Sequence, residues 1–197
     1  MPNPLLSILT SSVLRRWTLL QELIILMDSQ IKDLPVEHLV FIDNKKRSIG
    51  SKRQALLDLA QGDYLAFVDD DDVPAPDYVR EIMTVLNNGS PDLVVFPIRV
   101  TINGGQDGIV EPSVKYAPKI PGTPLAVYKP PVTNRPPHHL CVWRASIAKQ
   151  SRFPDQSGKE DFIWAEPLWP LVKKEVRIDK VLYWWDHQIQ RREHKSV

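Results

Sequence analysis

The first half of the chain alternates between short apolar runs and longer stretches with apolar residues on one face. Four runs bounded by polar residues predict buried strands: Leu5–Thr10, His38–Asp43, Tyr64–Val68 and Leu93–Phe96. Three intervening stretches predict helices: Val13–Met27, Ser48–Ala60 and Asp77–Leu86. Ser11 and Ser12 are candidate N-caps for the first helix, and Gly62 is a candidate stop signal for the second. This alternation predicts an α/β fold, with helices on both faces of a mostly parallel central sheet.

The second half begins with a proline-rich segment. Eight of the eighteen prolines lie between Pro112 and Pro137. Because proline lacks a donor N–H and fixes φ, residues 112–137 predict a long extended loop. Four further elements are predicted after it: a strand over Leu140–Trp143, helices over Ala145–Lys149 and Asp161–Trp169, and a strand over Val176–Trp185. A frayed polar tail is expected over Arg191–Val197. We find no internal repeat or linker, so we expect one domain spanning residues 1–197.

Composition excludes several protein classes. The apolar fraction of 43% and the charged fraction of 25% are ordinary for a globular domain and exclude a disordered chain. No apolar run reaches the ~20 residues that a membrane span requires. The N-terminus lacks the basic lead of a signal peptide, and the single cysteine, Cys141, excludes a disulfide framework. A cytoplasmic location is therefore expected.

The strongest chemical signal is the acidic box Asp69–Asp72, which directly follows a predicted strand. Four adjacent carboxylates repel one another unless a positive group lies among them. At the carboxyl end of a parallel strand they would face the crevice where α/β sheets bind ligands. Their oxygens suit Mg²⁺ or Mn²⁺ bound together with substrate phosphates. The alternative is a solvated acidic turn before the helix at Asp77.

Two further segments carry candidate chemistry. The basic stretch Asn44–Arg53 runs into a predicted helix N-terminus, where it would hold phosphate oxygens or form a solvated turn. The net charge of −4 over residues 1–100 and +5 over residues 101–197 fits adjoining cation and anion sites, or ordinary surface variation. Glu160 and Asp161 lie near aromatic residues at a predicted helix start. That position suits a general base with a raised pKa, or acids that stabilise the helix dipole.

Taken together, these motifs resemble family 2 glycosyltransferases of the Rossmann-like GT-A fold. The resemblance rests on a strand ending in Asp43, a basic loop with Gly50 and Arg53, and the segment Gly62–Asp72, which contains a strand followed by an Asp-X-Asp-Asp box. A later Glu-Asp pair of the family is matched by Glu160-Asp161. The similarity covers residues 5–100 well and residues 140–187 loosely.

The resemblance implies a role for each matching residue. The donor, with a UDP-sugar expected, would be bound by five residues: Thr10, Asp43, Arg53, Asp69 and Asp70. A divalent cation, Mn²⁺ or Mg²⁺, would be held by Asp71 with His187 as a further ligand. Catalysis would fall to Asp161 as the base, beside Glu160. Two departures from the family pattern concern the nucleotide pocket: Ser11, Ser12 and Val13 replace an aromatic-Asn pair, and Gln54 replaces an Asn.

The resemblance also implies the reaction. Residues 1–100 would bind the nucleotide-sugar and the metal, and residues 101–197 would bind the acceptor. The enzyme would invert the anomeric configuration, transferring the sugar to a hydroxyl of a glycan, lipid or protein, or of a hydroxymethylated base in DNA if the protein is phage-encoded and acts in the host cytoplasm. Five tryptophans would stack on the acceptor or pack in the core: Trp143, Trp164, Trp169, Trp184 and Trp185. The alternative functions are nucleotidyl transfer on a related fold and a non-catalytic nucleotide-sugar-binding module.

Overall fold

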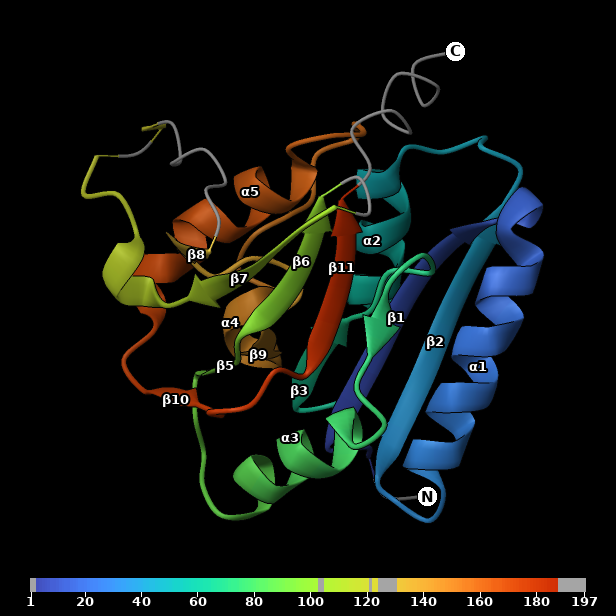
Figure 1. Cartoon of the computed structure of the whole chain (residues 1–197), viewed down its shortest axis with the longest axis horizontal. Helices are drawn as coiled ribbons and strands as arrows, with labels where there is room; N and C mark the ends of the chain where they lie inside the picture. The colour runs from blue at the N-terminus through green and yellow to red at the C-terminus, as the bar shows by residue number, and fades with distance from the viewer. Residues whose placement is uncertain (1–2, 103–104, 121, 124–130, 188–197) are drawn as a thin grey trace.

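The computed structural model describes residues 3–102, 105–120, 122–123 and 131–187 (Figure 1). The α-helices are α1 (Trp17–Ile31), α2 (Ile49–Leu59), α3 (Tyr78–Asn87), α4 (Ala145–Ala148) and α5 (Glu160–Ala165). The 3-10 helices are η1 (Leu14–Arg16), η2 (Val114–Tyr116) and η3 (Glu166–Leu171). None of the helices in these ranges has the length and apolar character needed to cross a membrane.

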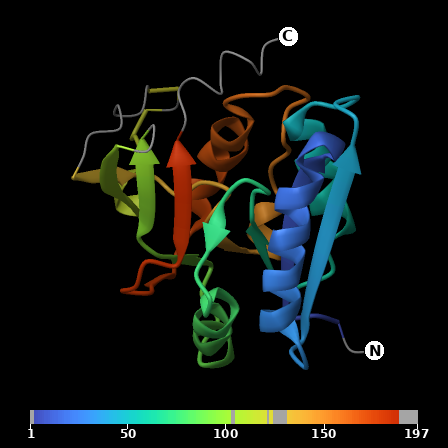
Figure 2. The same cartoon turned by 45° about the vertical axis from the view of Figure 1, so that its right-hand side comes forward.

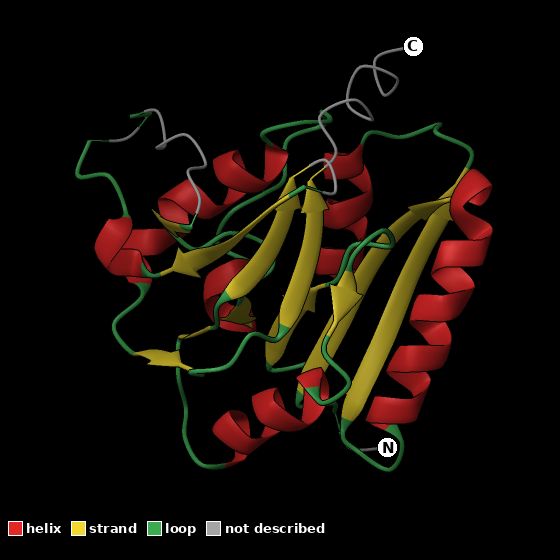
Figure 3. Cartoon of the chain, in the orientation of Figure 1, coloured by secondary structure: helices red, strands yellow, loops and turns green. Residues whose placement is uncertain are grey.

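The strands form two sheets, which Figure 3 shows in yellow. The central sheet, in the order β10-β5-β9-β3-β1-β2, contains β1 (Leu6–Val13), β2 (Val36–Asp43), β3 (Tyr64–Phe67), β5 (Leu93–Val95), β9 (Val142–Arg144) and β10 (Glu175–Arg177). The second sheet, in the order β4-β11-β6-β7-β8, contains β4 (Val73–Pro74), β6 (Ile98–Ile102), β7 (Gln106–Pro112), β8 (Val132–Arg135) and β11 (Tyr183–His187).

The α/β class is confirmed, and the central sheet is mixed. β1 pairs in parallel with β2 and β3, and β10 pairs in parallel with β5. β9 runs antiparallel to both of its neighbours. A parallel partner requires a crossover connection, usually a helix. β9 instead follows the strands of the second sheet, and it enters the central sheet in the opposite direction.

Helices cover both faces of the central sheet, as expected (Figure 2). Alternate residues of β3 divide between two apolar clusters: Tyr64 and Ala66 pack with α1 and α3, whereas Leu65 and Phe67 pack with α2, α4 and α5. This alternation follows from the period of two in a strand. A strand buried on both faces therefore carries the continuous apolar run that predicted it.

The proline-rich segment is more ordered than the predicted loop. Pro112 ends β7, η2 follows, and β8 pairs in parallel with β7. Those of its prolines that the structure describes lie at strand ends or outside the strands, where a missing N–H disrupts no ladder. Residues 121 and 124–130 of the predicted loop, and the predicted tail, lie outside the described residues. The predicted strand over Val176–Trp185 is two strands: β10 in the central sheet and β11 in the second sheet.

Two helix boundaries differ from the prediction. β1 continues to Val13, so Ser11 and Ser12 lie in the strand rather than capping the helix, and α1 begins only at Trp17. The predicted helix over Asp161–Trp169 is α5 followed by η3, because Pro167 and Pro170 lack the N–H that an α-helix needs.

Gly62 allows a close approach between two backbone segments. A Cβ at this position would lie 2.6 Å from the backbone nitrogen of Ser7 and 2.7 Å from its Oγ. α2 has already ended at Leu59, so Gly62 serves the packing of the following turn against β1 rather than stopping the helix.

We expect Gly62→Ala to destabilise the fold by about 1–3 kcal/mol, because the added methyl group would push the turn away from β1. Urea unfolding of both proteins measures this loss. Gly89→Ala is the matched control, since a Cβ there meets nothing closer than 3.6 Å and the free energy of unfolding should change by less than the Gly62→Ala loss. Equal stability of the two variants would contradict the packing role of Gly62.

Candidate active site

The candidate residues gather at the carboxyl ends of β1, β2 and β3. Asp43 is the last residue of β2, and Asp69–Asp72 follow β3. α2 and α5 bring Arg53, Glu160 and Asp161 to the same region. This edge is where open α/β sheets bind their ligands, and the sequence predicted this location for the acidic box.

Arg53 is the centre of a buried charge network. Its Nη2 donates to Asp69 Oδ1 at 2.7 Å, and its Nη1 donates to Glu160 Oε1 at 2.7 Å. Glu160 also accepts from the backbone N–H of Gly158 at 2.5 Å. Burial lowers the pKa of Arg53, but the carboxylates of Asp69 and Glu160 outweigh this effect and raise it. Arg53 therefore stays charged and holds two acidic segments together.

His139 connects this network to Asp161. Its Nε2 lies 2.9 Å from Arg53 Nη2 and 3.3 Å from Asp69 Oδ2, while its Nδ1 lies 3.2 Å from Asp161 Oδ2. Burial raises the pKa of Asp161, but the contact with His139 outweighs burial and lowers it. Asp161 is thus a carboxylate at neutral pH, with a third of its side chain exposed.

The rest of the acidic box is bound on its other side. Arg16 donates to Asp70 Oδ1 at 2.6 Å and reaches Asp71 Oδ2 at 2.9 Å, and Ser12 Oγ donates to Asp70 at 2.6 Å. Asp72 accepts from the hydroxyl of Tyr183 at 2.9 Å. Burial, followed by repulsion from Asp69 and Asp71, raises the pKa of Asp72 well above its usual range. Burial and this repulsion therefore favour the protonated form of Asp72.

The predicted donor residues on β1 and β2 lie apart from the Arg53 network. Asp43 accepts from the backbone N–H groups of Lys45 and Arg47, both at 3.0 Å, and Lys52 Nζ lies 3.5 Å from it. Thr10 Oγ1 shares a hydrogen bond with His38 Nε2 at 3.0 Å. The basic loop is thus organised around Asp43. The backbone of His187 ends β11, but its side chain lies outside the described part of the structure.

Sequence reasoning missed three residues of the site: Arg16, His139 and Tyr183. The adjacent pair His138-His139 before the strand at Leu140 was a visible signal, because histidine is a common proton carrier and metal ligand. Arg16 and Tyr183 carried no local signal, since each reaches the acidic box only through the fold.

The five tryptophans do not form one surface. Trp143, Trp164 and Trp169 are buried, and Phe153 stacks on Trp164 at 4.6 Å. Trp184 on β11 is 43% exposed, and the guanidinium of Arg99 lies 4.4 Å from its ring centroid. Core packing therefore explains the three buried rings, and the expected aromatic acceptor surface does not include them.

A histidine beside the site makes stability pH-dependent. Burial, opposed by Asp28, lowers the pKa of His38 to about 4. The unfolded chain binds a proton here below about pH 6.5, whereas the folded chain does so only below about pH 4. The free energy of unfolding should therefore fall as the pH falls from 6.5 to 4, at up to about 1.4 kcal/mol for each pH unit from this group.

His38→Gln should remove this contribution while keeping a hydrogen-bonding group near Thr10. Urea unfolding between pH 7 and pH 4 should show the wild type losing stability relative to the variant as the pH falls below about 6.5. A difference that stays constant across this range would contradict the low pKa of His38.

Comparison with known proteins identifies a matching family and solved structures with a similar fold. The family model described as Glycosyl transferase family 2 matches residues 5–151. No curated protein matches the sequence. The crystal structure of S. aureus TarS 1–349 superimposes with a TM-score of 0.54 at 15% identity, over 92% of this chain and 60% of that chain. The structure of its complex with UDP-GlcNAc has a TM-score of 0.55 at 14% identity and covers 92% of this chain and 58% of that chain. The structure of S. aureus TarS has a TM-score of 0.58 at 15% identity and covers 92% of this chain and 36% of that chain. The chain thus spans about 60% or less of these proteins, and the similarity confirms the expected GT-A fold.

Proposed function

The chain belongs to glycosyl transferase family 2, and from this premise we propose that it transfers a sugar from a nucleoside-diphosphate sugar to an acceptor hydroxyl. The observation that carries the proposal is the Arg53 network, which joins the acidic box after β3 to the Glu160-Asp161 pair of α5. Two sequence motifs that lie about ninety residues apart meet at one sheet edge, where a donor and an acceptor could react. The proposed division assigns residues 1–100 to the donor and residues 101–197 to the acceptor.

We propose a UDP-sugar as the donor. The S. aureus TarS 1–349 structures include complexes with UDP-GlcNAc and with UDP, and their fold is shared over 92% of this chain. In this proposal Thr10 in the C-terminal half of β1 and Asp43 at the end of β2 line the nucleotide pocket. The basic loop beside Asp43 and the N-terminal end of α2 supply the positive potential that a diphosphate requires.

The residues of the acidic box fit a divalent cation. Asp70 and Asp71 present carboxylate oxygens, the ligand type that Mg²⁺ and Mn²⁺ prefer, and in this structure they share one guanidinium, that of Arg16. Burial first, and repulsion from Asp69 and Asp71 second, raise the pKa of Asp72, so a cation bound beside it would favour its charged form. Asp71 is the proposed principal ligand, with His187 as a further one. When bound, the ion would neutralise the charge that develops on the leaving diphosphate.

The proposed mechanism is a single displacement with Asp161 as the general base. Its carboxylate stays ionised, and it is exposed enough to meet an acceptor hydroxyl. Asp161 removes the proton as the hydroxyl oxygen attacks the anomeric carbon, and the bond to the diphosphate oxygen breaks. Attack opposite to the leaving group inverts the anomeric configuration. Glu160 acts through Arg53, which it holds against Asp69. The acceptor hydroxyl belongs to a glycan, a lipid, a protein or a hydroxymethylated DNA base.

Ligand-dependent thermal stability tests the donor assignment. We expect UDP and UDP-GlcNAc with Mn²⁺ to stabilise the protein, by about 2.7 kcal/mol at a ligand concentration 100 times Kd. Other nucleoside diphosphates should shift the melting temperature less. If no nucleotide at millimolar concentration changes the melting temperature, with or without Mn²⁺, the chain is not a nucleotide-sugar enzyme.

Asp71→Asn should weaken the Mn²⁺-dependent binding of UDP at least tenfold, because the amide oxygen of asparagine carries no charge to bind the ion. Calorimetric titration of UDP with and without Mn²⁺ measures it. Asp77→Asn is the matched control: Asp77 pairs with Arg80 outside the box, and its replacement should leave the Mn²⁺ effect unchanged. Unchanged Mn²⁺ dependence in Asp71→Asn would contradict the ligand assignment.

A further inference from the structure

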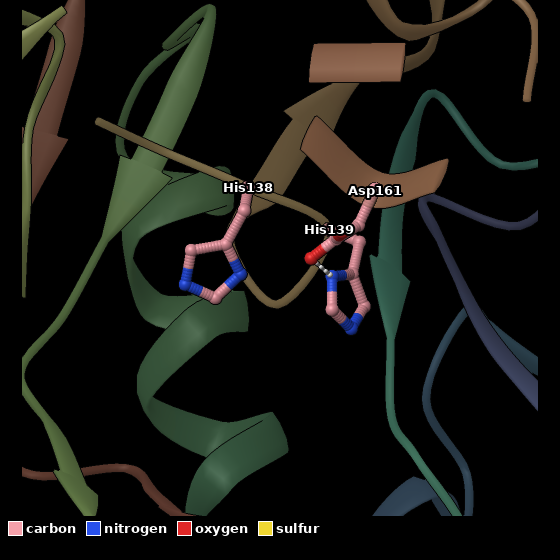
Figure 4. Close-up of side chains that lie close together, drawn as sticks. All are labelled: His138, His139 and Asp161. Carbon is pink, nitrogen blue, oxygen red and sulfur yellow. Dashed lines mark ion pairs between the residues drawn. The ribbon is translucent and has the colours of Figure 1, made fainter. Parts of the chain in front are cut away.

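Two adjacent imidazoles and one carboxylate converge beside the acidic box. His138 and His139 precede β9, and Asp161 lies in the first turn of α5 (Figure 4). Each residue offers one ligand atom, and these three atoms lie within 4.8 Å of one another. Figure 4 shows the Asp161 carboxylate reaching toward the two rings. Two nitrogens and one oxygen form a donor set different from the all-carboxylate box.

The contact between His139 and Asp161 lacks the geometry of a hydrogen bond. Nδ1 of His139 lies 3.2 Å from Asp161 Oδ2, yet this buried nitrogen has no hydrogen-bond partner among the described residues. Two ligands of a tetrahedral ion with bonds of about 2.0–2.1 Å lie roughly 3.3 Å apart. The Nδ1–Oδ2 spacing matches that separation. The His138 nitrogen lies within 4.8 Å of both atoms and would have to move closer when an ion binds.

The surroundings of the cluster suit a metal ion. The other nitrogen of His139 lies 3.3 Å from Asp69 Oδ2, so a carboxylate is already in place to orient the ring, as around many metal-bound histidines. Asp161 is a third exposed, which leaves an entry path and room for a water or hydroxyl as fourth ligand. Imidazole nitrogens favour Zn²⁺ over Mg²⁺, whereas carboxylate oxygens favour Mg²⁺.

We propose that His138, His139 and Asp161 form a zinc site, separate from the acidic box, whose occupation inhibits sugar transfer. The inhibition rests on the proposed function, because Asp161 cannot accept a proton from an acceptor while its carboxylate binds zinc. Zinc binding itself does not rest on it. The site would make transfer sensitive to zinc at Mn²⁺ or Mg²⁺ concentrations that fill the acidic box.

The test is a zinc titration of the whole chain in competition with a chromophoric chelator. We expect one zinc equivalent whose affinity falls at least tenfold in His138→Gln, while His38→Gln, which replaces a half-buried histidine on β2, keeps the wild-type affinity. If His138→Gln fails to fold, Asp161→Asn serves as the second variant, because its side chain is partly exposed and the substitution conserves shape. Excess Mg²⁺ should not displace the zinc.

The outcomes separate the two proposals. Equal zinc affinity of the wild type and both site variants would overturn the site. Zinc binding that depends on His138, with transfer unaffected at full occupancy, would retain the site and reject inhibition through Asp161. Zinc binding without any detectable nucleotide binding would retain the site and remove the proposed function.

Discussion

Asp161→Asn is expected to slow sugar transfer about 10²–10⁴-fold while leaving donor affinity close to that of the wild type. The asparagine amide keeps the shape of the carboxylate beside His139, but it cannot take a proton from the attacking hydroxyl. UDP release from UDP-GlcNAc, followed with a panel of hydroxyl acceptors, measures turnover, and calorimetry of UDP binding measures the donor site separately. Because Asp161 lies against His139, whereas Asp70 and Asp71 lie against Arg16, the loss should appear in kcat rather than in donor binding.

The control for this prediction is Asp179→Asn. Asp179 follows β10 and is an exposed carboxylate paired with Arg177, so turnover should stay unchanged. The comparison of the two variants would then separate the effect of losing the base from the effect of losing any carboxylate. If Asp161→Asn transfers sugar at the wild-type rate, another group removes the proton and the proposed mechanism is wrong.

The sequence predicted those features of the fold that depend on local pattern. Continuous apolar runs such as Tyr64–Val68 give β3 and β5 because strands buried on both faces carry no polar alternation. The runs that predicted β1 and β2 also form strands, although β2 is a half-buried edge strand. The sequence did not predict the second sheet. The strands of that sheet are connected through segments that contain glycine and proline, and several of them pair with strands far away in the chain. β11, for example, pairs with β4 and β6. Such pairings depend on tertiary contacts that no local period encodes.

The candidate site was predictable to a similar extent. Acidic and basic runs identified Asp69, Asp71 and Arg53 because charge clusters stand out in a sequence. Their partners did not stand out: Arg16 lies in a 3-10 turn with an unremarkable pattern, and Tyr183 reads as a core aromatic. The expected raised pKa of Asp161 was wrong in direction, because burial is outweighed by His139, a neighbour that the local sequence does not reveal.

Arg53→Met should cause the largest loss of stability, about 3–5 kcal/mol, because it leaves Asp69 and the buried Glu160 without their shared cation. Methionine fills much of the same volume, so lost packing contributes little. Urea unfolding at neutral pH measures the loss, and Arg80→Met provides the control: Arg80 is mostly exposed, so breaking its ion pairs should cost no more than about 1 kcal/mol.

A double variant separates stranded charge from lost packing as the cause. Arg53→Met combined with Glu160→Gln removes one of the two stranded carboxylates, so it should be more stable than Arg53→Met alone. Glu160→Gln by itself should be destabilising, since Arg53 then loses a charged acceptor at 2.7 Å. Opposite signs of the same substitution in the two backgrounds require direct coupling between the residues. Additive losses would mean that Arg53 stabilises the site through the packing of its aliphatic stem, and that the acidic segments of β3 and α5 are held together by the surrounding core instead.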